Sequence, residues 1–285
     1  MSKLKIAIQK SGRLHEDSLE LLKSCGIKLD NGKDQLKVAA SNFPLEILYL
    51  RNSDIPKYLE DGVADIAIVG ENLLIEQNKQ VDILRRLGFS KCRVSLAVPK
   101  EVDAPDSSYF QGKKIATSYP NTVCNFLRSK GVVAEIHVIS GSVEIAPNIG
   151  LADGICDIVS SGSTLFKNGL KETVLILNSE AVLAVSQKLS HEKGEILDKL
   201  LFRIEAVMLA KKSRYILLNV PNEKIASVSA ILPVLKSPTI LPLAEEGWSS
   251  LHSVIDEDKF WDVIDELKAA GAEGILVVPI DKMVL

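Results

Sequence analysis

The chain of 285 residues lacks any long apolar run and has only 4 cysteines and 5% aromatic residues. No stretch approaches the roughly 20 consecutive apolar residues that a membrane-spanning helix needs. The N-terminus also lacks the apolar core of a secretory signal peptide, so we expect a cytoplasmic protein without a membrane partner. Cys25, Cys92, Cys124 and Cys156 have no CxxC spacing and lie in apolar contexts, which favours buried free thiols over disulfides or a metal site.

A large excess of one charge is absent as well, but the charge is distributed unevenly. Residues 214–285 contain 6 Lys and Arg against 11 Asp and Glu, a net charge of −5, and the remainder contains 28 against 26, a net charge of +2. No long basic stripe is present, which argues against nucleic acid as the main partner. The mildly basic body suits an anionic small molecule.

Over the first 180 residues, short β-rich runs such as 5–9 and 65–70 alternate with amphipathic helical patterns. This alternation is typical of α/β layers, and we expect mainly parallel sheets. Two successive sets of such units predict two lobes with a cleft between them. We expect residues 1–90 and 180–213 to form the first lobe and residues 91–179 the second.

From residue 214 the pattern changes. Strand patterns at 215–220, 238–243, 248–255 and 274–278 alternate with helical patterns at 222–232 and 256–271. The order β-α-β-β-α-β within roughly 70 residues is typical of a ferredoxin-like domain. Such domains often sense small molecules, although the fold alone does not prove this role.

The most informative segment runs from Glu144 to Leu165 and predicts a short helix, a buried strand and a turn that opens another helix. Small hydroxyl residues and a glycine at such a turn offer backbone N–H groups, hydroxyl donors and a positive helix end to a phosphate. The predicted phosphate and ribose contacts are Asp157, Ser160, Ser161, Gly162, Ser163 and Thr164. Asp157 and Glu144 are the candidate catalytic carboxylates. An ordinary helix N-cap for the turn, and structural roles for both acids, are the alternatives.

The same segment resembles the signature of one family, ATP phosphoribosyltransferase. The matching residues are Glu144, Gly150, Ala152, Ile155, Asp157, Ile158 and 161–165, and residues 9–14, 70–72, 116–120 and 237–243 also agree with the family. The resemblance therefore covers essentially the whole chain. It implies the long form, with a two-lobe, periplasmic-binding-protein-like catalytic core and a C-terminal ferredoxin-like regulatory domain.

The resemblance also implies the reaction. The 5-phosphoribosyl group passes from phosphoribosyl pyrophosphate to N1 of ATP, which gives N1-(5-phosphoribosyl)-ATP and pyrophosphate in the first step of histidine biosynthesis. Mg²⁺ as cofactor, feedback inhibition by histidine and a homo-oligomer of dimers or hexamers are further implications. One residue departs from the family pattern. Asn148 stands where a basic residue is expected, so a phosphate charge must be met elsewhere or bound more weakly.

A second group of residues is expected to bind ATP or pyrophosphate. These candidates are Lys10, Gly12, Arg13, Arg51, Gly70, Glu71, Asn72 and Tyr119. Most of them follow an apolar strand, where the ligand contacts of α/β sheets gather, and arginine is suited to bidentate phosphate contact. The alternatives are solvated surface charge for the basic residues and simple packing for Tyr119. Arg85, Arg86 and Arg93 are weaker candidates.

Mg²⁺ prefers phosphate oxygens and keeps its waters, so we expect it to arrive with the substrates and name no protein ligand for it. Thr239 is a candidate contact for histidine, or else an ordinary strand residue. Two other function classes stay open from the sequence. They are a solute-binding module, since two such lobes also serve transport receptors, and a regulatory partner without catalysis.

Overall fold

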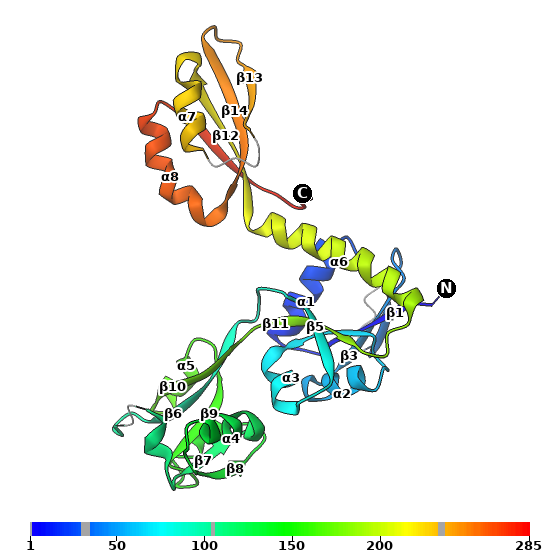
Figure 1. Ribbon diagram of the computed structural model, residues 1–285, viewed down its shortest axis with the longest axis vertical. Helices are drawn as coiled ribbons and strands as arrows, with labels where there is room; N and C mark the ends of the chain where they lie inside the picture. The colour runs from blue at the N-terminus through cyan, green and yellow to red at the C-terminus, as the bar shows by residue number, and fades with distance from the viewer. Residues whose placement is uncertain (1, 30–34, 104–105, 233–236) are drawn as a thin grey trace. The chain divides into compact units, whose positions relative to one another are not determined.

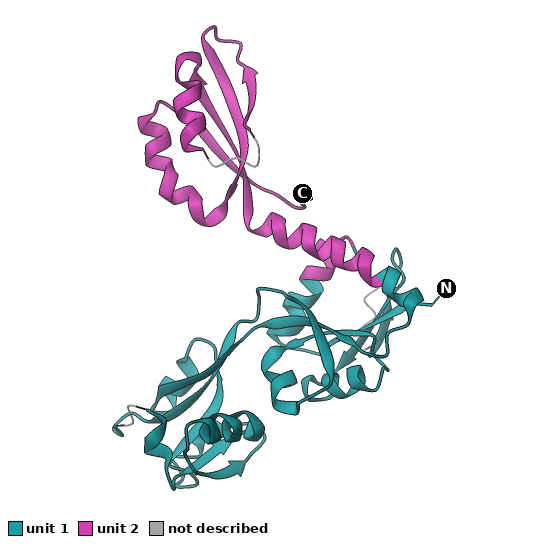
Figure 2. Ribbon diagram, in the orientation of Figure 1, with its two compact units in different colours: residues 1–20, 27–196 teal, residues 21–26, 197–285 magenta. Residues whose placement is uncertain are grey.

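A computed structural model describes residues 2–29, 35–103, 106–232 and 237–285 of the chain (Figure 1). The chain divides into two compact units (Figure 2). The first comprises Met1–Glu20 and Ile27–Ile196, and the second comprises Leu21–Gly26 and Leu197–Leu285. The first unit contains two separate sheets, each with its own helices, which we call lobe I and lobe II.

Lobe I is built on a six-stranded sheet. Its strands in spatial order are β2 (Lys37–Ala39), β3 (Leu45–Leu50), β1 (Leu4–Gln9), β4 (Ile66–Gly70), β11 (Ala181–Ser186) and β5 (Val81–Arg86). The helical elements are α1 (Arg13–Ser24), η1 (Asn52–Asp54), α2 (Ile55–Glu60) and α3 (Glu71–Gln77). Fully buried Ala7, Ala67 and Val69 of the central strands pack with Ile55 and Leu59 of α2. This one-sided apolar packing holds α2 on the sheet.

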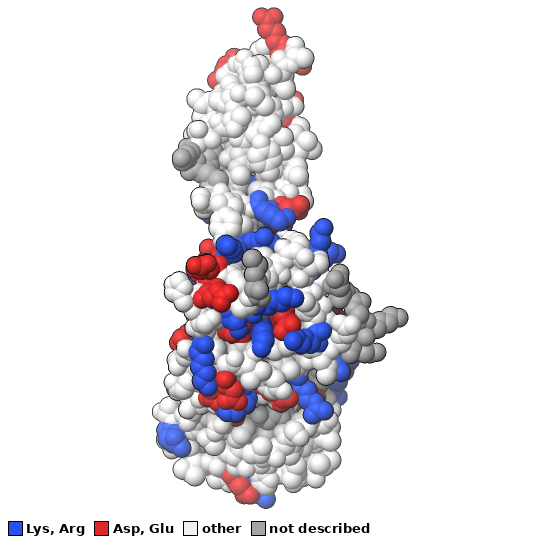
Figure 3. Space-filling view, turned by 90° about the vertical axis from the view of Figure 1, so that its right-hand side faces the viewer, with Lys and Arg blue, Asp and Glu red and all other residues white. Residues whose placement is uncertain are grey.

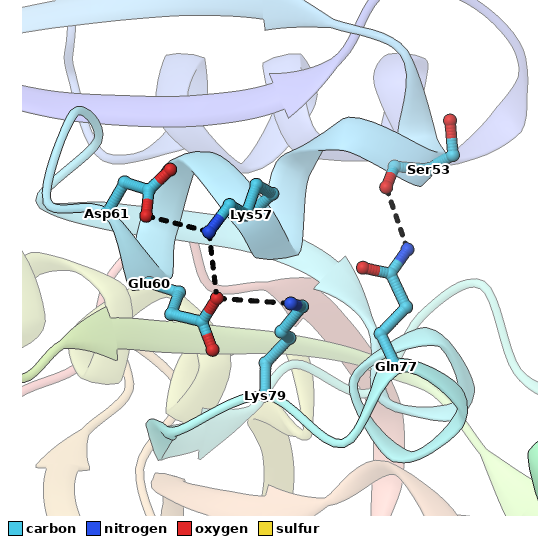
Figure 4. A network of polar contacts seen from close by, with 6 residues as sticks. All are labelled: Ser53, Lys57, Glu60, Asp61, Gln77 and Lys79. Carbon is cyan, nitrogen blue, oxygen red and sulfur yellow. Dashed lines mark hydrogen bonds and ion pairs between the residues drawn. The ribbon is translucent and has the colours of Figure 1, made fainter.

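Polar contacts fasten the neighbouring segments of lobe I to α2 (Figure 4). The Lys57 ammonium donates to Asp61 at 2.9 Å, and the Lys79 ammonium donates to Glu60 at 3.1 Å. The Gln77 side-chain amide donates to the backbone carbonyl of Ser53 at 2.7 Å. The end of α3 and the segment that follows it are therefore tied to lobe I.

Lobe II is built on a five-stranded sheet in the order β10 (Leu170–Ser179), β6 (Cys92–Pro99), β9 (Gly154–Val159), β7 (Lys114–Thr117) and β8 (Glu135–Val138). Its helical elements are η2 (Ser107–Phe110), α4 (Pro120–Ser129), η3 (Val143–Ile145) and α5 (Ser163–Lys167). Buried Leu96, Phe110, Ile115 and Val123 belong to its core.

The expectation of mainly parallel sheets is wrong, because both sheets are mixed. β1 is parallel to β3 and β4, and β7 is parallel to β8 and β9. β11 is antiparallel to β4 and β5, and β10 is antiparallel to β6. Parallel neighbours need a long crossover connection, whereas β10 and β11 are separated only by Glu180 where the chain passes between the lobes.

The second unit carries the expected β-α-β-β-α-β domain. After α6 (His191–Lys211) come β12 (Ser213–Pro221), η4 (Asn222–Lys224), α7 (Ile225–Ile231), β13 (Thr239–Pro242), β14 (Trp248–Asp256), α8 (Glu257–Ala269) and β15 (Glu273–Pro279). The sheet order is β13-β14-β12-β15, with antiparallel pairs throughout. Ile216, Leu218, Leu251 and Leu267 are buried in a core that draws only on this domain.

All four cysteines are free thiols, as predicted, but only Cys25 and Cys156 are buried, whereas Cys92 and Cys124 are partly exposed. No helix within the described ranges has the length and apolar character needed to cross a membrane. On the face drawn in Figure 3, basic and acidic side chains are interspersed. This distribution agrees with the small net charge.

Candidate active site

The phosphate turn connects β9 to α5 and owes its shape to a glycine. Gly162 is the N-cap of α5 and has φ of +77°, a left-handed conformation that glycine adopts without steric cost. The Phe166 N–H donates to the Gly162 carbonyl at 3.0 Å and so begins the helix. The turn and its flanks line a cavity of about 180 Å³, whose lining residues are Glu144, Asp157, Ile158, Val159, Ser160, Ser161, Gly162, Ser163, Thr164 and Leu165.

The alternative interpretation of the turn is an ordinary helix N-cap without a role in binding. No side chain of the N-cap residue caps α5, because that residue is Gly162. The Ser161 and Ser163 hydroxyls bond each other at 3.0 Å and line the cavity together with Thr164. The N–H groups of a first helical turn have no acceptor within the helix. The Ser163 N–H donates to the Ser161 hydroxyl at 3.4 Å, so part of the local capping comes from Ser161. The hydroxyls of the turn line the cavity.

The two candidate carboxylates line the same cavity. Asp157 is half-buried in β9, and burial raises the pKa of its carboxyl to about 6. A hydrogen bond from the Ile158 N–H at 2.8 Å lowers this pKa, and the negative charge of Glu144 in η3 raises it. Asp157 thus holds its proton to a higher pH than an exposed aspartate does, at the wall of the cavity that the turn lines.

Arg93 has a structural position beside the turn. Its guanidinium donates to the Ser160 carbonyl at 3.0 Å and pairs with the Glu172 carboxylate at 2.6 Å. The Ser95 hydroxyl also donates to Glu172, at 2.7 Å. Strands β6 and β10 together therefore hold the entry to the turn. The sequence contains no signal for this contact, since Glu172 lies 79 positions from Arg93.

In lobe I, Lys10 and Arg51 follow two paired strands. Gln9 of β1 lies opposite Leu50 of β3, and the Lys10 N–H donates to the Leu50 carbonyl at 2.8 Å. Lys10 and Arg51 are therefore neighbours at the carboxyl ends of these strands, and both are exposed. Arg13 begins α1, also exposed, with its guanidinium 3.8 Å from Asp17. Gly12 just before it has φ of +91°.

Glu71 and Asn72 are buried at the start of α3, and their side chains are engaged inside the protein. The Glu71 carboxylate forms a bidentate pair with Arg86. The Asn72 side chain accepts from the Ser179 hydroxyl at 2.9 Å and donates to the Tyr119 hydroxyl at 3.4 Å. A Cβ on Gly70 would lie 2.5 Å from the side-chain Oδ1 of Asn72, so a larger residue there would displace this amide. Glu71 and Asn72 thus organise the end of β4.

A second cavity, of about 220 Å³, lies where the chain passes between the lobes. It is lined by Arg86, Lys91, Cys92, Asn178, Ser179 and Glu180. Among these residues only Arg86 was a sequence candidate. The others come from two segments that are far apart in the sequence, and none carries a recognisable motif.

Three further candidates have separate positions. Tyr119 is half-buried at the N-cap of α4, where burial and the negative charge of Asp157 raise the pKa of its hydroxyl above the usual range. Asn148 is exposed, and its amide donates to the Asn168 carbonyl at 3.0 Å, next to α5. Thr239 is exposed on β13 opposite His252 of β14.

Comparison with known proteins identifies the family. A family model for ATP phosphoribosyltransferase matches residues 51–206, and a model described as HisG, C-terminal domain, matches residues 210–282. The ATP phosphoribosyltransferase of Cytophaga hutchinsonii is 59% identical over 281 residues, which cover 99% of this chain and 98% of that protein. The protein of the same name from Bacteroides fragilis is 55% identical over 282 residues, covering 99% of this chain and all of that protein.

A solved structure shares the fold. A chain of the ATP phosphoribosyl transferase (HisG:HisZ) complex from Thermotoga maritima has a TM-score of 0.62 and 30% identity, and the match covers 71% of this chain and 96% of that one. The chain therefore belongs to the ATP phosphoribosyltransferase family, the enzymes of the first step of histidine biosynthesis.

Proposed function

We propose that this chain transfers the 5-phosphoribosyl group of phosphoribosyl pyrophosphate to N1 of ATP with the turn 160–164 as the anchor of the 5-phosphate. The observation that carries this assignment is the single cavity that the turn shares with Asp157 and Glu144. Ser160, Ser161, Gly162, Ser163 and Thr164 supply the phosphate donors, and Asp157 accepts ribose hydroxyls.

The chemistry asks for positioning and charge rather than for a nucleophile on the protein. Departure of pyrophosphate from C1 gives the ribose oxocarbenium character, as in other glycosyl transfers. A carboxylate beside the ring stabilises this positive charge, and Asp157 has that place in the proposed site. Glu144 lies near enough to raise the pKa of Asp157, and its own negative charge adds to the field that favours a positive charge on ribose.

The nucleotide end of the site belongs to lobe I in this proposal. Lys10, Gly12, Arg13 and Arg51 bind the phosphates of ATP or the departing pyrophosphate, because three of them are exposed cations after paired strands. Gly70 allows the close turn into α3. Glu71 and Asn72 orient Arg86 and Tyr119 beside the nucleotide.

Mg²⁺ would enter this site bound to the phosphates of the substrate. Among the residues that the structure describes, no three His, Cys, Asp or Glu side chains converge in a metal-binding group. A magnesium ion held by phosphate oxygens needs only one or two protein carboxylates, and Asp157 and Glu144 are two such groups in one cavity. When bound, Mg²⁺ would neutralise charge on the departing pyrophosphate.

The proposal extends to regulation. Residues 214–285 form the module that binds histidine, with Thr239 as one contact, since Thr239 is exposed on a strand beside His252. Residues 1–90 with 180–213, and residues 91–179, form the two catalytic lobes. We propose that the protein assembles into dimers and hexamers. Sedimentation with and without histidine tests this assembly.

Two substitutions test the site. Asp157→Ala and Thr164→Val should each lower kcat/KM by at least about 100-fold, the usual cost of losing a group that stabilises charge in a transition state. Formation of the N1 adduct is followed by ultraviolet absorbance, with pyrophosphatase present. Thr173→Val is the matched control, because its hydroxyl bonds the Leu96 carbonyl at 3.3 Å and does not line the cavity. Wild-type rates in folded Asp157→Ala and Thr164→Val would refute the assignment.

A further inference from the structure

One contact within the first unit joins the two lobes through a buried carboxylate. Glu76, on α3 of lobe I, is 7% exposed. Its Oε1 accepts from the Asn121 N–H at 3.0 Å, and its Oε2 accepts from the N–H and the hydroxyl of Thr122 at 2.9 and 2.7 Å. The backbone carbonyl of Glu76 also accepts from the Asn121 side chain at 2.9 Å. All four donors lie in the first turn of α4 of lobe II.

The first turn of α4 needs an acceptor that its own sequence does not provide. The N-cap residue is Tyr119, which makes no side-chain cap, and Pro120 follows it. Helical N–H groups at such an end have no partner within the helix, and the helix dipole favours a negative charge there. A serine or aspartate at position 119 would cap the helix locally. Here the cap comes from Glu76, a residue 45 positions earlier on a helix of the other lobe.

The end of α3, which carries Glu76, is held in lobe I by its neighbours in the sequence. The next residue, Gln77, bonds the Ser53 carbonyl, and Lys79 bonds Glu60 of α2 (Figure 4). One turn earlier on the same helix, Asn72 reaches the Tyr119 hydroxyl. Residues four apart lie on the same face of a helix, so α3 presents both contacts to the start of α4.

The start of α3 lies beside residues of the proposed site. Tyr119, just before α4, is close enough to Asp157 for the aspartate charge to act on its hydroxyl. Glu71 and Asn72 begin α3 at the nucleotide end. The position of α4 against α3 therefore sets how the phosphate turn of lobe II faces the nucleotide residues of lobe I.

We propose that Glu76 is a positioning residue, whose carboxylate clasps the start of α4 to α3 and so holds the two halves of the active site at the distance that transfer requires. Glu76 contacts no substrate in this scheme. Only its kinetic readout rests on the proposed function, because the clasp itself is measured without turnover.

The first measurement follows the clasp directly. In the wild-type protein the amides of Asn121 and Thr122 should be protected from hydrogen exchange. In Glu76→Ala their protection should fall, and in Glu76→Gln it should fall by less, because one oxygen remains to accept a bond. Amides in β6 and β9 should exchange as in the wild type. Unchanged protection of Asn121 and Thr122 in both variants would overturn the proposal.

The second measurement separates positioning from stability. Glu76→Ala should lower kcat by about 10- to 100-fold, the scale of a misplacement of about 1 Å. The Kd for phosphoribosyl pyrophosphate should stay within about threefold, since lobe II alone supplies that turn. Glu76→Gln should have an intermediate kcat, and it also serves if Glu76→Ala does not fold.

The matched control is Asp65→Asn. Asp65 is likewise a buried carboxylate that accepts a backbone N–H, from Lys5 at 2.8 Å, but both residues belong to lobe I. This variant should lower the melting temperature and leave kcat unchanged. A kcat within twofold of wild type in Glu76→Ala, with the amides of α4 exposed, would contradict the positioning role and leave Glu76 only as a cap of α4. If the wild-type protein forms no adduct, the proposed function fails while the exchange data still decide the clasp.

Discussion

At the scale of single residues, Asp157 shows how burial serves two purposes. The residue is placed in an apolar strand, so its carboxylate is costly to ionise, and burial raises its pKa to about 6. The same partly dry position strengthens its interaction with a developing positive charge on ribose. The burial of Asp157 therefore lowers the stability of the folded protein while it strengthens the proposed catalytic interaction.

The pH dependence of stability follows from this raised pKa. Between about pH 4 and pH 6 the folded protein keeps a proton on Asp157 that the unfolded chain has lost, so the free energy of unfolding falls as pH rises through this window. Asp157→Asn should therefore raise the free energy of unfolding by up to about 3 kcal/mol at pH 7.5 and have little effect near pH 4. Denaturant unfolding at both pH values measures this. Equal effects at both would contradict the raised pKa.

The pH dependence of kcat/KM should also reflect the ionisation of Asp157. If transfer requires ionised Asp157, kcat/KM for phosphoribosyl pyrophosphate should fall below about pH 6. Glu144→Gln removes the negative charge that raises this pKa, so the acid limb should move to lower pH. Both proteins use the same substrate, so titration of its phosphate cancels in the comparison. If the acid limb of the profile stays at the same pH in Glu144→Gln, the charge of Glu144 does not act on the pKa of Asp157.

Gly162 offers a backbone test of the phosphate turn. A Cβ there would meet only Val159, at 3.9 Å, so Gly162→Ala should be strained only by its φ of +77°. We expect a loss of about 1 kcal/mol in the free energy of unfolding, as the left-handed conformation costs other residues. The KM for phosphoribosyl pyrophosphate should rise about tenfold, because the turn relaxes away from its donor geometry.

The control for this change is Gly131→Ala, at the end of α4. Gly131 has φ of +69° and open space around it, so the backbone strain is matched without a change at the turn. Thermal melting and initial rates compare the two variants. A similar KM in both would mean that the shape of the turn does not matter for substrate binding.

At the scale of elements, one buried ion pair links the start of β4 to the start of α6. The Lys193 ammonium donates to both oxygens of Asp65, at 2.9 and 2.8 Å, and Asp65 also accepts from the Lys5 N–H of β1. Three segments of lobe I thus meet at one carboxylate that is 5% exposed. Such a pair is poor evidence of net stabilisation, but breaking one half leaves a buried charge.

Lys193→Met should accordingly lower the free energy of unfolding by about 3 kcal/mol, since the buried Asp65 carboxyl loses its cationic partner. The double variant Lys193→Met with Asp65→Asn should recover part of this loss, because no unpaired carboxylate remains. Guanidinium unfolding of the three proteins measures the coupling. Additive losses in the double variant would show that the two side chains do not interact in solution.

The elements also show what sequence patterns could predict. Apolar periodicity predicted β1, β4, β9 and the order of the C-terminal domain, because each pattern is local. The turn 161–164 was visible for the same reason. The antiparallel pairing of β10 with β6, and of β11 with β4 and β5, was not predictable from the sequence, since it depends on where the chain passes between the two sheets. Glu71 of α3 pairs with Arg86 of β5, and Arg93 of β6 pairs with Glu172 of β10. Because the partners lie on different elements, residue type alone made Glu71, Arg86 and Arg93 look like ligand contacts or surface charge.

At the scale of the whole molecule, the C-terminal domain has an apolar core of its own. The core of the C-terminal domain consists of residues from Ile216 to Ala272 alone, and the cores of the lobes lie within the first unit. The acidic charge is concentrated after residue 214, so the C-terminal domain differs electrostatically from the rest of the chain. Units with separate cores can unfold separately, and a regulatory unit can lose its structure while the catalytic one keeps its own.

Leu251→Ala tests this separation. Leu251 is fully buried in β14, and its truncation should lower the stability of the C-terminal domain by about 2–5 kcal/mol. Calorimetry should show one transition moved to lower temperature and another unchanged. Turnover without histidine should remain, whereas inhibition by histidine should weaken, because the proposed histidine contact Thr239 lies on the strand that pairs with β14.

Leu96→Ala is the matched control, since Leu96 is equally buried but lies in β6 of lobe II. It should lower the other transition and impair turnover, because β6 supports the strand that carries Asp157. If both substitutions shift a single common transition, the chain unfolds as one cooperative body. Histidine inhibition would then reach the active site through global stability, and regulation could not be assigned to the C-terminal domain by its fold alone.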